Sequence, residues 1–212
     1  MGLYAKDMNI FFDLDGTIID SKQRLYQLFQ FLVPESNFSF YEYWELKMNK
    51  ISNESILKTY FPNIDILMFH ENWMALIESE EYLILDLPFP GTTEYLNGLK
   101  QNEAIIYLLT ARQSIISVSY QLNRFGWSNM FSDIFVTEQK YEKAEMIKHL
   151  VYNHSLNWIV GDTGKDIQTG KILGVNTVAV LTGFLSGDIL KTYEPDIIVD
   201  NVTLFNPFTY HK

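Results

Sequence analysis

Acidic and hydroxyl side chains directly follow three separate apolar runs of the sequence. The motif DLDGT occupies residues 13–17, the run IIYLLT ends at Thr110, and the motif GDTGKD occupies residues 161–166. Because ligands collect beyond the carboxyl ends of parallel strands, we expect the side chains at these three ends to share one site. Four of the side chains are carboxylates, those of Asp13, Asp15, Asp162 and Asp166.

Such a cluster of acids predicts a bound cation. Four carboxylates crowded together at low dielectric repel one another strongly unless a positive ion lies among them. A hard, oxygen-ligated ion fits this ligand set best, and magnesium is the usual one in phosphate chemistry. The sequence therefore indicates a Mg²⁺ site at this edge of the sheet.

Each motif has a simpler interpretation when it is taken alone. Asp-Gly is a common turn pair, and an EF-hand loop that began at Asp13 would need Gly and Glu where Ile18 and Arg24 stand. GDTGKD lacks the earlier glycine, and the Ser or Thr after the lysine, that a P-loop requires. The joint placement of the motifs at three strand ends, and no single motif, indicates a functional site.

Strands and helices alternate through most of the chain. Apolar runs predict five strands, at residues 8–13, 105–110, 133–136, 157–161 and 177–181, with a candidate sixth at 196–200. Amphipathic stretches predict helices at residues 92–101, 113–125, 141–152 and 165–173. This alternation implies right-handed crossovers and a parallel sheet covered on both faces. The expected fold class is α/β, with a Rossmann-like doubly wound parallel sheet.

One interval departs from this alternation. Residues 19–87 contain no strong strand run but several helical patterns, such as SKQRLYQLFQFL and ENWMALIESEEYL, and LPFPG at residues 87–91 closes the interval. We therefore expect a helical insert after the first strand, joined to the rest of the chain by two hinges. Its many aromatic residues are expected mainly to pack its own core, because a small insert needs large side chains to bury enough area.

Composition and charge restrict the class of partner. The 212 residues carry a formal net charge of -10, which repels a nucleic-acid polymer, and they include no cysteine for disulfides or thiolate chemistry. A small phosphorylated metabolite is compatible with this charge because a bound metal reverses the field locally. The opening stretch is too weakly apolar for a signal peptide, and no run is long enough to span a membrane. We expect a cytoplasmic protein without membrane contact, as a monomer, with a dimer as the alternative.

The motifs, in this order, resemble those of the haloacid dehalogenase superfamily phosphatases. The matching stretches are DLDGT at 13–17, LLT at 108–110, a lysine near 143 and GDTGKD at 161–166. The resemblance covers nearly the whole chain and is closest to the phosphoglycolate-phosphatase-like branch, whose helical cap follows the first strand. It implies a core domain of residues 1–18 and 88–212 and a small α-helical cap domain of residues 19–87.

The resemblance also implies roles for the acids. Asp13 is expected to attack phosphorus and form an aspartyl phosphate. Asp15 is expected to protonate the leaving oxygen and later to accept a proton from water. Direct magnesium ligands would be Asp13, the Asp15 carbonyl and Asp162, with Asp166 acting through water. Because a halide needs no proton, the presence of Asp15 favours phosphoryl transfer over dehalogenation.

Further residues are expected to contact the phosphoryl group or the rest of the substrate. The Thr110 hydroxyl and backbone amides near Ala111 would bind phosphoryl oxygens, and a lysine would neutralise their charge. Neither Lys140 nor Lys143 is followed by the proline found in many relatives, so both are candidates. Lys143 is favoured, with Lys140 as the alternative, because Lys143 begins the helical stretch KAEMIKHL, where a first-turn residue can point back to the sheet edge. Arg112 is a candidate contact for a second substrate anion, beside a structural or surface role.

Three functions are compatible with these motifs. The leading hypothesis is a magnesium-dependent phosphatase that hydrolyses a small phosphate monoester through a phosphorylated Asp13. A phosphosugar mutase would use the same residues and return the phosphoryl group to a sugar. A non-catalytic phosphometabolite sensor would need neither the nucleophile nor the acid, so the presence of Asp13 and Asp15 argues against it. The sequence does not rank individual substrates, because fold does not supply function at that resolution.

Overall fold

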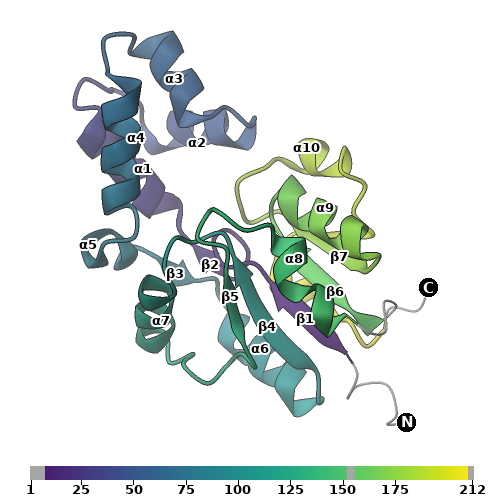
Figure 1. The fold of residues 1–212 in the computed structure, drawn as a ribbon. Helices are drawn as coiled ribbons and strands as arrows, with labels where there is room; N and C mark the ends of the chain where they lie inside the picture. Colours follow the sequence, from purple (N-terminus) through teal and green to yellow (C-terminus); the bar gives the residue numbers. More distant parts are fainter. Residues whose placement is uncertain (1–7, 152–155, 210–212) are drawn as a thin grey trace.

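A parallel six-stranded sheet forms the centre of the molecule (Figure 1). The structure is a computed structural model, and it describes residues 8–151 and 156–209. The strands are β1 (Asn9–Phe12), β4 (Ile105–Thr110), β5 (Ile134–Val136), β6 (Trp158–Gly161), β7 (Asn176–Val180) and β8 (Ile197–Val199). They lie in the order β5-β4-β1-β6-β7-β8, and every neighbouring pair is parallel. The expected α/β doubly wound fold and the sixth strand are therefore confirmed.

Helices cover both faces of this sheet. Successive residues of β1 point to opposite faces, so Ile10 and Phe12 pack in one core cluster and Phe11 in another. The first cluster includes residues of α6 (Thr92–Gln101), α7 (Ile115–Arg124) and the 3-10 turn η3 (Val202–Leu204). The second includes residues of α8 (Lys143–Ile147) and lies on the side that α9 (Gly164–Leu173) also covers.

One predicted helix is shorter than expected. The expected helix at residues 141–152 consists of α8 and the 3-10 turn η1 (Lys148–Leu150), and its last residue, Tyr152, lies outside the described part of the chain. The helix α10 (Gly187–Lys191), which follows β7, has only five residues. Short elements such as α10 leave too weak a periodicity to be recognised in a sequence. No helix among residues 8–151 and 156–209 combines the length and apolar character that a membrane span requires.

Five helices form a separate layer above the sheet edge (Figure 1). They are α1 (Lys22–Leu32), α2 (Phe40–Met48), α3 (Asn53–Tyr60), α4 (Ile66–Leu76) and α5 (Glu80–Leu83). Buried aromatic side chains fill the space between them, among them Phe29, Tyr43, Trp44, Phe61 and Phe69. The helical character expected for residues 19–87 agrees with these elements. The division into a core (1–18 and 88–212) and a cap (19–87) stays a prediction, and its residues 1–7, 152–155 and 210–212 lie outside the described chain.

A two-stranded antiparallel ribbon closes the base of the helical layer, where no strand was expected. β2 (Ile19–Asp20) pairs with β3 (Leu87–Pro88), so the chain enters and leaves the layer side by side. Two residues per strand are too few to produce a recognisable alternation in the sequence. This ribbon places the helical layer over the carboxyl ends of β1 and β4.

Candidate active site

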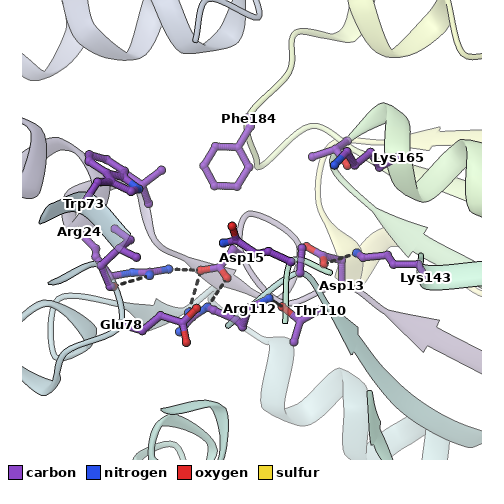
Figure 2. A pocket seen from close by; sticks show the side chains of 15 residues that line it. Asp13, Asp15, Arg24, Trp73, Glu78, Thr110, Arg112, Lys143, Lys165 and Phe184 are labelled. Carbon is purple, nitrogen blue, oxygen red and sulfur yellow. Dashed lines mark hydrogen bonds and ion pairs between the residues drawn. The ribbon is translucent and has the colours of Figure 1, made fainter. Parts of the chain in front are cut away.

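Most of the expected site residues line one cavity at the carboxyl edge of the sheet (Figure 2), but Asp162 and Asp166 are not among its lining residues. Asp13 directly follows β1, Thr110 ends β4, and Lys143 begins α8. The cavity has a volume of about 250 Å³, and its walls include Asp13, Asp15, Thr110, Ala111, Arg112 and Lys143. Residues from both the sheet edge and the helical layer line it, so a molecule bound there would lie between the two.

Lys143 bridges two carboxylates. Its Nζ donates to Asp13 Oδ1 and to Asp166 Oδ1, each at 2.6 Å. All three side chains are almost fully buried. Burial alone lowers the pKa of Lys143, but the two carboxylates outweigh it and raise the pKa above its usual value. The ammonium group is therefore held positive beside the Asp13 carboxylate.

Lys140, the alternative lysine, does not reach this group. Its side chain is 71 % exposed and pairs with Glu138 at 3.3 Å. Lys143 begins a helix whose first turn faces the sheet edge, whereas Lys140 lies in the turn after β5. The geometry thus favours Lys143 over Lys140 as the lysine of the site.

Asp162 is held in place from two sides. Its Oδ1 accepts a hydrogen bond from the Thr17 hydroxyl at 3.2 Å, and its Oδ2 accepts one from the Phe184 amide at 2.7 Å. The main chain approaches this carboxylate closely at Gly16, which has a φ of 78°, and at Gly183. A Cβ on Gly183 would lie 1.9 Å from Asp162 Oδ2, and one on Gly16 would lie 2.6 Å away. Both positions therefore require glycine.

The acids fit an oxygen-ligated divalent cation. Asp13, Asp162 and Asp166 offer oxygen atoms that all lie within 4.8 Å of one another. With Lys143 charged, these three carboxylates carry two uncompensated negative charges inside the protein. Burial raises the pKa of Asp13 to about 7, against the attraction of Lys143, and burial with the neighbouring acids raises the pKa of Asp162 well above its usual value. Such pKa values mark a group of acids that a cation would stabilise in the ionised form.

Asp166 already has partners for both of its oxygens. Besides Lys143 on Oδ1, the Thr163 hydroxyl and amide donate to Oδ2 at 2.6 and 3.1 Å. Asp13 Oδ2, in contrast, accepts no hydrogen bond from the described residues. Among the described residues, Asp13 therefore keeps one oxygen without a hydrogen-bond donor, whereas Asp162 and Asp166 have donors on both oxygens. The contact of Asp166 with a cation through water stays a prediction.

The Asp15 carboxylate points away from Asp13 and toward two arginines (Figure 2). Arg112 donates from Nε to Oδ2 at 2.6 Å and from Nη2 to Oδ1 at 2.9 Å, and Arg24 of α1 also contacts Oδ1. Burial alone would raise the pKa of Asp15, but Arg112 and Arg24 hold it well below its usual range. The structure thus presents Asp15 as an ionised carboxylate.

Behind Asp15, a buried polar network joins the helical layer to the sheet. Asp86, which is fully buried, accepts hydrogen bonds from Arg24 Nε at 3.0 Å, Arg112 Nη2 at 3.2 Å and Gln121 Nε2 at 2.7 Å. Arg24 Nη1 also donates to the Ile77 carbonyl at 2.9 Å. The network connects α1, the end of α4, the chain just before β3 and α7. Arg112 is part of this network, and only its buried Nη1 lacks a partner among the described residues.

The sequence analysis missed Arg24, Asp86 and Gln121. One signal could have indicated Arg24, because it precedes the buried Leu28 by four residues and so lies on the same helix face. Asp86 and Gln121 carry no comparable signal, because their partners come from distant segments. Phe184, whose amide binds Asp162, was missed for the same reason.

Thr110 and Ala111 complete the wall beside Asp13. The Thr110 side chain is buried, and its hydroxyl accepts a hydrogen bond from the Arg112 amide at 3.4 Å. Ala111 is exposed toward the cavity. The expected phosphate contacts therefore lie on the same wall as Asp13 and Lys143, while Asp15 and Arg112 lie toward the helical layer.

Comparisons with known proteins agree with this geometry. The chain is 28% identical over 214 residues to pyrophosphatase PpaX of Oceanobacillus iheyensis, covering 91% of this chain and 92% of the relative. A haloacid dehalogenase-like family hydrolase from Streptococcus pneumoniae superposes with a TM-score of 0.74 at 19% identity, covering 95% of each chain. A predicted phosphoglycolate phosphatase from Haemophilus somnus superposes with a TM-score of 0.75 at 20% identity, covering 94% of this chain and 96% of that one. The two superpositions show a shared fold.

The family itself follows from the match along the sequence. The model of the haloacid dehalogenase-like hydrolases matches residues 10–180. That span includes Asp13, Thr110, Lys143 and Asp162, and it also includes the whole helical layer. The chain therefore belongs to the haloacid dehalogenase-like hydrolase family.

Proposed function

We propose that the protein is a magnesium-dependent phosphatase that hydrolyses a small phosphate monoester through a phosphoryl group carried on Asp13. One observation carries the proposal: the buried Asp13 carboxylate pairs with Lys143 through Oδ1, and its Oδ2 accepts no hydrogen bond from residues 8–151 and 156–209. Asp13 belongs to the wall of the cavity of about 250 Å³ that Thr110 and Lys143 also line. A nucleophile needs such a free lone pair next to the bound substrate.

Asp13, the Asp15 carbonyl and Asp162 would hold the magnesium ion, with Asp166 acting through water. The ion, when bound, would neutralise charge on the phosphoryl oxygens and on the attacking carboxylate. The surplus of two buried negative charges and the all-oxygen donor set support this assignment. Thr17 and the Phe184 amide would keep the Asp162 carboxylate oriented.

The protein residues would divide the reaction into two displacements. In the first, an Asp13 oxygen bonds to phosphorus as the bond to the leaving oxygen breaks, and the alcohol departs with a proton. In the second, water attacks the phosphorus of the aspartyl phosphate, the Asp13–phosphorus bond breaks, and inorganic phosphate leaves. The Thr110 hydroxyl, the amide near Ala111 and the Lys143 ammonium would stabilise the charge on the transferring oxygens.

Asp15 would deliver the proton to the leaving oxygen and accept one from the attacking water. In the observed arrangement Arg24 and Arg112 bind both of its oxygens, which favours the ionised form. Proton transfer therefore requires at least one arginine to release the carboxylate. Arg112 could then offer its unpartnered Nη1 to a second anionic group of the substrate.

The relatives support a small phosphorylated substrate. Those described above are named as a pyrophosphatase, a hydrolase and a phosphoglycolate phosphatase. None of these names favours the phosphosugar mutase or the non-catalytic sensor. The cavity of about 250 Å³ also favours a small molecule over a polymer.

Phosphate release tests the proposal. The purified protein should release inorganic phosphate from p-nitrophenyl phosphate when Mg²⁺ is present and stop when EDTA is added. Asp13→Asn should abolish the release, whereas Asp133→Asn, on an exposed acid at the start of β5, should leave it intact. Full turnover by the Asp13→Asn protein would refute the nucleophile, and metal-independent turnover would refute the role of magnesium.

A further inference from the structure

Two cavities meet between the sheet edge and the helical layer. Beside the cavity around Asp13, a second one of about 820 Å³ extends under the helical layer. Three residues line both cavities, namely Leu25, Trp73 and Gln139. A leaving group that extends from the phosphoryl position into the larger cavity would have to pass these three side chains.

Gln139 differs from Leu25 and Trp73 in the part of the fold to which it belongs and in its hydrogen-bonding groups. Leu25 and Trp73 belong to α1 and α4 of the helical layer, whereas Gln139 belongs to the turn after β5. Leu25 has no polar atom and Trp73 offers a single donor, but the Gln139 carboxamide both donates and accepts. In the described part of the chain this carboxamide makes no hydrogen bond, and the residue is exposed. Its hydrogen-bonding capacity is thus available to a ligand.

The main chain holds Gln139 in an unusual conformation. Glu138 and Gln139 both have positive φ angles, 52° and 55°, in the left-handed region that side chains other than glycine rarely adopt. The turn is anchored by the buried Thr137, whose hydroxyl accepts the Gln139 amide at 3.2 Å. Thr137 also donates its own amide to the Thr110 carbonyl at 2.9 Å. Gln139 is therefore fixed relative to the wall that would bind the phosphoryl group.

Residues that hold a side chain at such a sparsely populated φ are found preferentially at functional sites. Glycine would adopt the same φ without strain, but it would leave no side chain between the cavities. The neighbouring Glu138 has the same backbone geometry but pairs with Lys140 and lines neither of the two cavities. The strained turn thus presents one of its two side chains to the cavities and the other to solvent.

We propose that Gln139 is a specificity-determining residue that hydrogen-bonds a hydroxyl or carbonyl group on the leaving group of the substrate. This inference rests on the proposed phosphatase function and narrows it to esters whose leaving group can form hydrogen bonds. The larger cavity agrees with such a group, because the polar residues Lys47, Asn53 and His70 also line it.

Two matched glycine substitutions distinguish the effect of the Gln139 side chain from that of the turn conformation. Gln139→Gly and Glu138→Gly each suit the left-handed backbone, so both variants should fold, which circular dichroism and thermal unfolding would check. Each protein would be assayed on glycerol phosphate, whose leaving group carries hydroxyls, and on phenyl phosphate, whose leaving group carries none. We expect Gln139→Gly to lower kcat/KM for glycerol phosphate about three- to tenfold, as for the loss of one hydrogen bond.

The control reactions decide the interpretation. Gln139→Gly should change kcat/KM for phenyl phosphate by less than about twofold, and Glu138→Gly should leave both substrates within that range. An equal loss on both substrates, the same selective loss in Glu138→Gly, or no loss at all would overturn the inference. So would a wild-type protein that hydrolyses phenyl phosphate but not glycerol phosphate. A wild-type protein that hydrolyses neither, nor any other phosphate ester, would instead refute the phosphatase itself, and this inference with it.

Discussion

Replacement of Lys143 by methionine tests the electrostatics of the site without reference to any substrate. Lys143 is the buried cation among the acids of the site, 2.6 Å from both Asp13 and Asp166. Methionine keeps the length and apolar body of the side chain but removes its charge. The acids would then face one another without compensation, so we expect a large loss of stability in the absence of metal.

The size of the expected loss of stability follows from the burial of the ion pairs that Lys143 makes. Breaking a buried ion pair by removing one partner costs about 3–5 kcal/mol. For a chain of this size, each kcal/mol lowers Tm by about 2–4 °C, so the expected loss is about 6–20 °C. Lys140→Met is the matched control, because Lys140 pairs with Glu138 on the surface, where both side chains are largely exposed. An exposed pair contributes at most about 1 kcal/mol, or less than about 4 °C.

Thermal unfolding with EDTA and with Mg²⁺ would measure these differences. Mg²⁺ should stabilise Lys143→Met by supplying positive charge to the same acids. Adding Asp166→Asn to Lys143→Met should recover part of the lost stability, because it removes one of the unpaired carboxylates. If Lys143→Met unfolded at the same temperature as Lys140→Met, Lys143 would not be the buried counter-charge of the site.

Three further predictions concern the acids and the buried network. Gly183→Ala should displace Asp162 and weaken Mg²⁺ binding measured by calorimetry. The control Gly187→Ala, whose Cβ would meet its nearest neighbour at 3.4 Å, should bind Mg²⁺ normally. Equal Mg²⁺ affinities of the two variants would contradict the close packing of Gly183 against Asp162. Because the pKa of Asp13 is raised to about 7, the metal-free protein should lose stability as the pH rises from about 4 to 7, and Mg²⁺ should raise Tm more at about pH 8 than at about pH 5.5. A pH-independent rise would contradict this. Asp86→Asn should cost about 3–5 kcal/mol in urea unfolding, because two buried guanidinium groups would lose a shared carboxylate; a loss below about 1 kcal/mol would contradict it.

The parallel sheet could be predicted from the sequence because its strands are buried on both faces. Runs such as IIYLLT at residues 105–110 are continuously apolar and are bounded by polar residues, which makes both their type and their ends recognisable. The two-residue strands β2 and β3 could not be predicted, because they have no periodicity of their own. Their pairing depends on a contact between distant segments, in which Ile19 pairs with Pro88 and Asp20 with Leu87.

The candidate site could likewise be predicted from the sequence only in part. Asp13, Thr110 and Asp162 were expected together because each lies at the carboxyl end of a strand, and parallel strands end at one edge. The partners of Asp15 could not be inferred, because Arg24 and Arg112 approach it from α1 and from the loop after β4. Sequence spacing specifies which side chains reach the sheet edge, but it does not specify how a carboxylate turns once it is there.

The proposed reaction requires that Asp13 becomes phosphorylated during turnover. The protein would be mixed with radiolabelled phenyl phosphate and Mg²⁺, quenched in acid within the first turnover and digested with pepsin. Mass spectrometry of the peptides would then locate any added phosphoryl group. We predict one phosphoryl group on the peptide that contains Asp13, and none in the Asp13→Asn protein. Phosphate release without any labelled protein, or label on a residue other than Asp13, would contradict the account.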